Sequence, residues 1–331
     1  MTGEAGARRS FALGTRRGIA ACASERGTFA VLALDHRQNL RRELRPADPA
    51  SVTYDEMVEF KRAVVRALAS VATGTLLDPE IGAAQSIADG SLPASAGLLV
   101  AIEATGYDGA STARISRVLD GWSVDKAKRM GASAAKLLVY YHPDDANAAD
   151  QERLVGAVAA DCLAADLALF VEPLSFSIVE GEPLTGEARR HVVVETARRL
   201  TAIGGDILKA EFPYDPSVTD RDLWREACNE LDVASAVPWV LLSGGVDGAT
   251  FEAQVSTACA AGASGVLVGR SVWAEAATME PAARDAFLAT TGRERFRRLA
   301  DLVDGTGRPW DDRPNRLTNA PPPGDGWYRE Y

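Results

Sequence analysis

The lysines of this chain are few, and two of them lie where an amine would be expected to react. Lysine makes up only five of the 36 basic residues. Lys136 and Lys209 fall inside the apolar runs AAKLLVYY and DILKAEFP, which have the composition of strands. The others lie in polar, helix-like stretches where an ammonium can stay hydrated: Lys61, Lys126 and Lys128. Arginine is not deprotonated in proteins, whereas a buried lysine loses its charge readily and can attack a carbonyl group. Lys136 and Lys209 are therefore the candidate reactive amines.

Acidic residues stand at the ends of similar apolar runs. Glu172 lies in LALFVEP and Asp35 closes TFAVLALD. Other runs are followed by further carboxylates: Asp78, Glu80 and Glu103. An amine flanked by carboxylates suits imine chemistry, because forming and dehydrating a carbinolamine both require proton transfers. Two amines close together would also lower each other's affinity for a proton. A buried salt bridge is the alternative for either lysine, and Lys209 could simply pair with Glu211 on the same strand face.

Eight short apolar runs recur along the chain, each followed by a stretch of helical periodicity. Nearly continuous apolar strands indicate a parallel sheet buried on both faces, and eight strand–helix units in about 250 residues are typical of a closed (β/α)8 barrel, the TIM barrel. A doubly wound open sheet is the alternative, but no GxGxxG follows the first run. The runs span residues 28–35, 73–79, 96–103, 134–141, 167–173, 206–213, 238–245 and 265–273. The clearest helical stretches are residues 54–72, 150–165, 192–203 and 250–261.

We expect one domain. Residues 1–14 form a flexible N-terminus, residues 15–304 the barrel, and residues 305–331, rich in Pro and Gly, an irregular tail. A helix at residues 16–26 is expected to cap the bottom of the barrel.

Glycines follow the last two strands, where barrels of this kind commonly bind phosphate. SGGV at 243–246 and VGR at 268–270 contain Ser243, Gly244, Gly245, Gly269 and Arg270. The glycines let the backbone approach an anion, and arginine supplies a forked charged contact. Tight turns without a ligand are the alternative.

The overall charge favours a small-molecule substrate. The formal net charge of -10 opposes binding to nucleic acid or to an anionic membrane. The four cysteines are scattered, as expected for reduced thiols, and the sequence has neither a span of roughly 20 apolar residues nor a signal-peptide core. These features predict a cytoplasmic protein, and we expect a homo-oligomer.

Histidine is too sparse for a metal centre built from several imidazoles. His36, His142 and His191 are the only histidines, and His191 is expected to open a surface helix. We therefore expect no metal and no cofactor. A zinc-dependent enzyme, in which the metal instead of an iminium ion stabilises an enolate, is the alternative.

Eight segments together resemble one enzyme family. They are ALDHR, LLDPE, GLLVAIEATGYD, AAKLLVYYHPDD, FVEPL, DILKAEFP, PWVLLSGGVD and AGASGVLVGRSVW. In order, from about Phe29 to Trp310, the chain resembles the class I tagatose 1,6-bisphosphate aldolases and the related sulfofructose 1-phosphate aldolases.

The resemblance implies a role for each matching residue. Lys209 matches the Schiff-base lysine, Glu172 the acid/base, Lys136 the assisting cation and Asp35 the active-site aspartate. The groups that hold the carbon-1 phosphate match Ser243, Gly244 and Arg270. His36 replaces the glutamine usual in the first motif, so we expect His36 and Arg37 to contact the sugar. The anion at carbon 6 could be met by Arg37, Arg41 or Arg42.

The expected reaction is a reversible cleavage of a ketohexose 1-phosphate, foremost tagatose 1,6-bisphosphate, into dihydroxyacetone phosphate and glyceraldehyde 3-phosphate. EATGYDG at 103–109 favours this substrate, whereas the short region 212–238 favours sulfofructose 1-phosphate. A barrel that binds sugar phosphate without turnover, as a regulator, is the alternative of another class. The final residue, Tyr331, invites comparison with the terminal tyrosine of muscle-type aldolases, but we expect an exposed side chain with no catalytic part.

Overall fold

A closed barrel of eight parallel strands forms the centre of the protein, in the computed structural model that describes residues 12–329 and 331. The strands follow one another around the barrel in chain order, interrupted only by a small hairpin. This confirms the predicted (β/α)8 barrel. The barrel strands are β1 (Phe29–Leu34), β2 (Gly74–Leu77), β3 (Gly97–Ala101), β6 (Ala134–Tyr140), β7 (Ala168–Leu174), β8 (Ile207–Ala210), β9 (Trp239–Leu242) and β10 (Gly265–Val268). The last predicted run is too long, because its final residues form a helix, Arg270–Trp273.

Helices surround the barrel and mostly match the predicted periodic stretches. Thr53 and Glu56 form a capping box that starts α3, and Asp247 caps the start of α9. The helices are α1 (Leu13–Ala21), α2 (Gln38–Leu44), α3 (Tyr54–Leu68), α4 (Ala83–Ala88), α5 (Val124–Met130), α6 (Ala148–Ala164), α7 (Gly186–Ile203), α8 (Arg221–Ala234), α9 (Gly248–Ala261), α10 (Arg270–Trp273), α11 (Pro281–Phe287) and α12 (Arg293–Thr306). Short 3-10 turns lie at Pro49–Ser51, Ala69–Val71, Ala274–Thr278 and Trp327–Arg329, and a π-turn at Leu288–Gly292. His191 lies inside α7, which begins at Gly186, so the expectation that it opens this helix is wrong.

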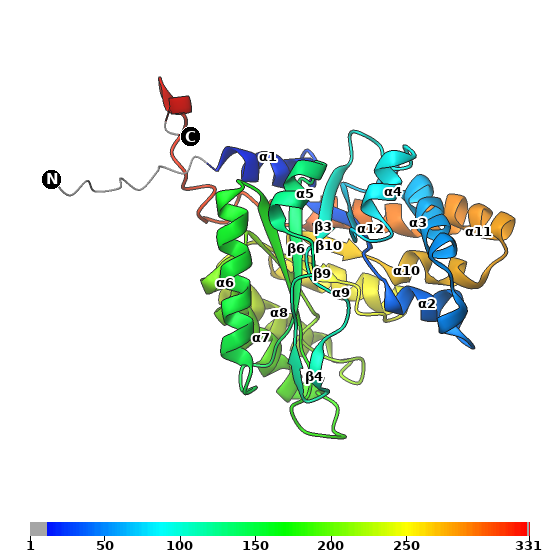
Figure 1. The fold of residues 1–331 in the computed structure, drawn as a ribbon. Helices are drawn as coiled ribbons and strands as arrows, with labels where there is room; N and C mark the ends of the chain where they lie inside the picture. The colour runs from blue at the N-terminus through cyan, green and yellow to red at the C-terminus, as the bar shows by residue number, and fades with distance from the viewer. Residues whose placement is uncertain (1–11, 330) are drawn as a thin grey trace.

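A two-stranded antiparallel hairpin interrupts the pattern after β3. Its strands are β4 (Asp108–Ala110) and β5 (Ala113–Ile115). In Figure 1 this hairpin lies at one end of the barrel and α1 at the other, with β6 running between them.

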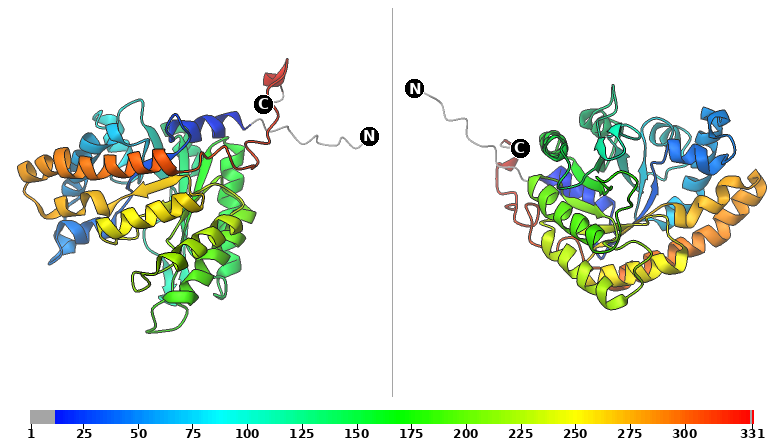
Figure 2. Two further views of the ribbon diagram at one scale, coloured as in Figure 1. Left: turned by 180° about the vertical axis from the view of Figure 1, so that it is seen from behind. Right: turned by 90° about the horizontal axis from the view of Figure 1, so that it is seen from below.

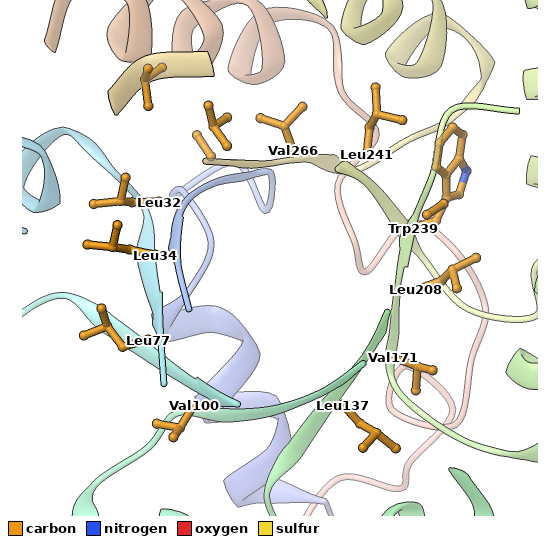
Figure 3. Close-up of a cluster of buried hydrophobic side chains, with 14 of the residues drawn as sticks. Leu32, Leu34, Leu77, Val100, Leu137, Val171, Leu208, Trp239, Leu241 and Val266 are labelled. Atoms are coloured by element: carbon orange, nitrogen blue, oxygen red, sulfur yellow. The ribbon is translucent and has the colours of Figure 1, made fainter. Parts of the chain in front are cut away.

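The strands bury both faces, and this divides their side chains into two sets. One set points outward to the helices, as Figure 3 shows for Leu32, Leu137 and Leu208. The other set fills the barrel interior and includes Phe170 and Ile207. Because side chains alternate along a strand, the residues two positions after an interior residue also face inward. Polar residues at such positions therefore meet inside the barrel.

The end of the barrel opposite the hairpin is closed by α1 and by the C-terminal segment. Ile19 of α1 packs in one cluster with Phe29, Trp310 and Leu317, and Figure 2 shows this segment running past α1. Gly97 permits the close approach of α1, because a Cβ there would lie 2.2 Å from the Ala21 carbonyl oxygen.

Charged contacts also hold this segment. Arg316 pairs with Asp206 at 2.5 Å, and Arg313 pairs with Asp232. The segment is irregular, as expected, yet its aromatic and aliphatic anchors are buried. The helix before it runs to Thr306, beyond the expected boundary at 304, and the expected N-terminal segment 1–14 lies almost wholly outside the described residues. In the described part of the chain, every helix is too short or too polar to cross a membrane.

We expect Trp310→Ala to lower the free energy of unfolding by about 3–5 kcal/mol, because it removes a buried indole from this end of the barrel. Urea denaturation followed by circular dichroism measures the change. Tyr328→Ala is the matched control, since Tyr328 is exposed on the same segment. Equal unfolding midpoints for the two variants would contradict the packing described here.

Candidate active site

A cavity of about 600 Å³ opens at the carboxyl ends of the strands. Its lining includes every predicted site residue except Gly245: Asp35, His36, Arg37, Lys136, Glu172, Lys209, Ser243, Gly244, Gly269 and Arg270. The barrel therefore brings together residues that are up to 235 positions apart between Asp35 and Arg270.

Lys136 lies at the centre of the cavity floor and is 1% exposed. Its Nζ contacts three carboxylates: Asp35 Oδ2 at 2.7 Å, Glu103 Oε1 at 2.7 Å and Glu172 Oε2 at 2.8 Å. Burial alone would favour the neutral amine, but the three negative charges outweigh it and raise the pKa of Lys136 well above its usual range. Lys136 is a permanent cation at neutral pH.

Glu172 joins the two interior lysines. Its Oε1 forms an ion pair with Lys209 Nζ at 2.7 Å, and its Oε2 forms one with Lys136 Nζ at 2.8 Å. Phe170 pairs in register with Ile207, so Glu172, two residues further, is level with Lys209. Burial opposes ionisation of Glu172, but Lys136 and Lys209 overcome it and lower the pKa of this carboxyl. The ionised carboxylate is therefore within hydrogen-bond reach of both amines.

Lys209 does not form the salt bridge with Glu211 that the sequence analysis gave as the alternative. Glu211 instead accepts hydrogen bonds from Ser175 and forms an ion pair with Arg189 at 3.0 Å. Lys209 is 4% exposed and has Glu172 as its ion-pair partner. Its amine thus lies on the cavity floor beside an ionised carboxylate.

Glu103 is a residue of this cluster that the sequence analysis did not single out. It was seen at a strand end, but its contact with Lys136 depends on the pairing of β3 with β6, in which Ala101 lies beside Lys136. Glu103 Oε2 also accepts from the Leu138 amide at 3.0 Å, which fixes the carboxylate. Strand alternation is the sequence pattern that points to Glu103. Leu99 faces the barrel interior, and Glu103, four residues later, continues on the same face of the strand.

Asp35 completes the ring of acids. Burial would raise its pKa, but Lys136 and Lys209 prevail and hold the pKa of Asp35 well below its usual range. At neutral pH the cluster therefore contains ionised carboxylates directed at one ammonium group.

A third buried lysine lies outside the cavity. Lys61 is fully buried and forms an ion pair with Asp78, so the expectation that it stays hydrated is wrong. Asp78 also accepts from the backbone amides of Glu80 and Ile81. The pair stabilises the turn after β2, and Asp78 does not line the cavity.

The loops after β9 and β10 border the cavity with Ser243, Gly244, Gly269 and Arg270. Gly244 and Gly245 both have positive φ, 54° and 81°, which favours glycine. Gly245 does not line the cavity; it lies behind Arg270, since a Cβ at Gly245 would approach Arg270 Nη2 to 3.0 Å. The nearest carboxylate to Arg270 is that of Glu43 at 3.7 Å, a loose contact that leaves the guanidinium available to an anion.

His36 packs edge-on against Trp273, with ring centroids 5.1 Å apart. Its Nδ1 is buried and has no hydrogen-bond partner among the described residues. Burial, reinforced by Arg270 and Lys209, lowers the pKa of His36 to about 4. The imidazole is therefore neutral at pH 7.

The three arginines considered for a second anion differ in position. Arg37 Nη1 binds Glu80 Oε2 at 2.6 Å and Nη2 donates to the Glu103 carbonyl at 2.7 Å. Arg42 lines the cavity on the side of α2. Arg41 donates to the Val52 carbonyl and does not line the cavity, so it is excluded from the site.

Within the described residues, no group of three His, Cys, Asp and Glu side chains is arranged to hold a metal ion. The three converging carboxylates surround Lys136 Nζ instead. His142 packs against Phe176, away from these carboxylates.

The sequence profile of the DeoC/LacD family of aldolases matches residues 29–275, most of the chain and all of the barrel strands. The chain belongs to this family. The tagatose 1,6-diphosphate aldolase of Lactococcus lactis subsp. lactis is 31% identical over 324 residues, covering 90% of this chain and 98% of the relative. That of Streptococcus agalactiae serotype III is 32% identical over 313 residues, covering 87% and 95%.

Solved aldolase structures share the fold. A Schiff-base-forming fructose-1,6-bisphosphate aldolase aligns with a TM-score of 0.57 at 20% identity, covering 86% of this chain and 98% of that one. The family match and the curated relatives confirm the family resemblance and identify this chain as an aldolase, an aldehyde-lyase.

We expect Lys136→Met to lower the free energy of unfolding by about 3–5 kcal/mol at pH 7, because it leaves the carboxylates buried without their common cation. The pKa values of those carboxyls then rise above their unfolded values, so the loss diminishes as the pH falls and the carboxyls take up protons. Urea denaturation at pH 7 and pH 5 measures this. Lys128→Met is the control, and a loss independent of pH would contradict the charge assignment.

We expect His36 to make stability depend on pH below neutrality. Between its ordinary pKa of 6.5 and its folded pKa of about 4, the unfolded chain binds more protons, so stability falls as the pH falls. The contribution reaches roughly 3 kcal/mol at the bottom of this window. His36→Gln should remove this dependence, so that the change in unfolding free energy between pH 7 and 4.5 is about 2–3 kcal/mol smaller than in the wild type. Parallel pH profiles for the two proteins would show that His36 is not held neutral.

Proposed function

We propose that this aldolase uses the class I, Schiff-base mechanism and cleaves tagatose 1,6-bisphosphate reversibly into dihydroxyacetone phosphate and glyceraldehyde 3-phosphate. The observation that carries the proposal is the Glu172 carboxylate, which binds Lys209 at 2.7 Å and Lys136 at 2.8 Å on the floor of the cavity. The substrate named for its relatives, with 31% and 32% identity, supports the choice of ketose.

Lys209 is the nucleophile. Its neutral amine attacks the C2 carbonyl carbon, and one proton moves from nitrogen to the C2 oxygen to give the carbinolamine. The proton that Lys209 gives up to become a neutral amine passes to Glu172, 2.7 Å away, and Glu172 then delivers this proton to the carbinolamine hydroxyl, which leaves as water. The product is an iminium ion, which accepts the electron pair in the next step.

Cleavage uses the same carboxylate. Glu172 takes the proton of the C4 hydroxyl, the C3–C4 electron pair moves into the iminium, and the aldehyde departs from the enamine of dihydroxyacetone phosphate. Protonation at C3 and hydrolysis of the imine regenerate Lys209. Lys136 keeps its charge throughout and stabilises negative charge on the substrate oxygens, while Asp35 orients the hydroxyls and holds Lys136.

Two anion sites fit the two phosphates. The carbon-1 phosphate binds Ser243, the backbone at Gly244 and Gly269, and Arg270, with Gly245 giving Arg270 its room. The carbon-6 phosphate binds Arg37. The hydrogen bond from Arg37 to the Glu103 carbonyl places the guanidinium at the end of β3, where it lines the cavity. His36, neutral beside this path, contacts a sugar hydroxyl.

Borohydride reduction with dihydroxyacetone phosphate should attach a three-carbon adduct to Lys209, read by peptide mass spectrometry. Lys209→Arg should give no adduct, because arginine cannot form the imine. Lys136→Arg, which keeps the cation, should retain the adduct and part of the turnover. Glu172→Gln should lower kcat by about 10²–10⁴. A wild-type protein without an adduct would overturn the mechanism.

A cleavage assay should rank tagatose 1,6-bisphosphate above fructose 1,6-bisphosphate and sulfofructose 1-phosphate in kcat/KM, with dihydroxyacetone phosphate as the detected product. Arg37→Met should raise KM by about tenfold or more for the bisphosphate, because a charged contact to the terminal phosphate is lost. Excess chelator should leave the rate unchanged, since the iminium replaces a metal. Binding of all three ketoses without turnover would favour a regulator, and a preference for the sulfonate would reassign the substrate.

A further inference from the structure

Two tyrosines form the side of the cavity that faces the phosphate loops. In the strand order of the barrel, β3 and β6 lie across from β9 and β10. Tyr107 follows β3 and Tyr140 ends β6, and both line the cavity. Their rings meet edge to face, with centroids 5.0 Å apart at 74°. We call this pair the tyrosine wall.

Arg114 of β5 holds the tyrosine wall in place. Its guanidinium carbon lies 4.6 Å from the Tyr107 ring centroid, 5.2 Å from that of Tyr140 and 5.1 Å from that of Phe176. These are cation–π distances, so one charge connects the hairpin, the end of β6 and the loop after β7. Arg114 has no carboxylate partner among the described residues. Its neighbour Arg117, by contrast, pairs with Asp108 at 3.1 Å.

The backbone of the hairpin is also fixed to the wall. Ser116 Oγ accepts from the Tyr140 amide at 2.8 Å, and the Ser116 amide donates to Gln151 at 3.0 Å. The tyrosine wall is thus held in place by the Arg114 side chain and by the backbone hydrogen bond between Tyr140 and Ser116.

The hydroxyl groups of the tyrosine wall are available to a ligand. Neither the Tyr107 nor the Tyr140 hydroxyl has a hydrogen-bond partner within residues 12–329 and 331. The next residue in the chain shows the contrast, because the Tyr141 hydroxyl donates to Glu152 at 2.5 Å. Burial raises the pKa of Tyr140, so its hydroxyl remains protonated and can donate.

We propose that Tyr107 and Tyr140, positioned by Arg114, bind the hydroxylated aldehyde half of the substrate and select which aldehyde is accepted. The inference rests on the proposed function, because that function fixes the direction of the substrate. With its carbon-1 phosphate at β9 and β10 and its C2 at Lys209, an extended ketose must direct C4 to C6 to the opposite side. There the aromatic faces cover the C–H groups of the sugar, and the phenol groups bond its hydroxyls.

The experiment separates the two halves of the reaction. Exchange of the C3 hydrogen of dihydroxyacetone phosphate with D₂O reports the imine and enamine without any aldehyde. Condensation with glyceraldehyde 3-phosphate, and with unphosphorylated glyceraldehyde, reports the aldehyde half. The variants are Tyr140→Phe, which removes one hydroxyl only, and Arg114→Met, which removes the positioning charge. Tyr54→Phe, an exposed tyrosine outside the cavity, is the matched control.

Tyr140→Phe and Arg114→Met should each raise KM for both aldehydes, by about tenfold for one lost hydrogen bond, while hydrogen exchange falls less than threefold. Unchanged condensation in Tyr140→Phe, or an equal fall in exchange and condensation, would overturn the proposal. An effect of Arg114→Met limited to the phosphorylated aldehyde, with Tyr140→Phe at the wild-type level, would make Arg114 an anion ligand and also overturn it. Failure of the proposed function looks different: the wild-type protein would form no adduct and show no exchange.

Discussion

The structure depends on one buried ammonium group and the acids that surround it. Isolating any of Asp35, Glu103 or Glu172 in the barrel interior would carry a large desolvation cost, and the same holds for Lys136. Together they form ion pairs with N–O distances of 2.7 to 2.8 Å. Lys136 and Glu172 lie on the neighbouring strands β6 and β7, and Asp35 and Glu103 follow β1 and β3, so the cluster forms only when this part of the sheet curves around a common interior. Curvature of the sheet and neutralisation of these charges therefore depend on each other.

The cluster also defines what Glu172 can do. Lys136 occupies one of its oxygens with a fixed charge, which leaves the oxygen facing Lys209 for proton exchange. When Lys209 carries a positive charge, as an ammonium or as an iminium ion, the Glu172 carboxylate lies beside that charge in either form. In the proposed mechanism the site is thus organised for the intermediate before the substrate arrives, so little reorganisation is needed during the reaction.

Much of this site could be predicted from the sequence, because alternation along a strand is a local property. Lys136, Glu172 and Lys209 lie in apolar runs, so their inward direction follows from their neighbours. The role of Glu103 depends on which strand pairs with β3, which local patterns do not report. Lys61 was misjudged for a related reason. Its helix is polar on average, and only the packing of α3 over the end of β2 shows that this position meets Asp78. The hairpin was missed because strands of three residues, flanked by glycine and polar residues, give too short an alternation to recognise.

The two ends of the barrel have separate tasks, and this separation bears on the source of protons. The Tyr331 hydroxyl donates a hydrogen bond to Asp166, which also accepts hydrogen bonds from the amides of Gly14 and Thr15 at the start of α1. Asp166 precedes β7, whereas Glu172 lies near its carboxyl end, and six residues of extended chain separate them by roughly 20 Å. The layer between them contains Phe170 and other interior apolar side chains. In this arrangement Tyr331 contributes to the closed end of the barrel, as Trp310 and Leu317 do. The proton transfers of the proposed reaction must then be carried by groups at the open end, and Glu172 is the carboxylate placed against the reacting amine.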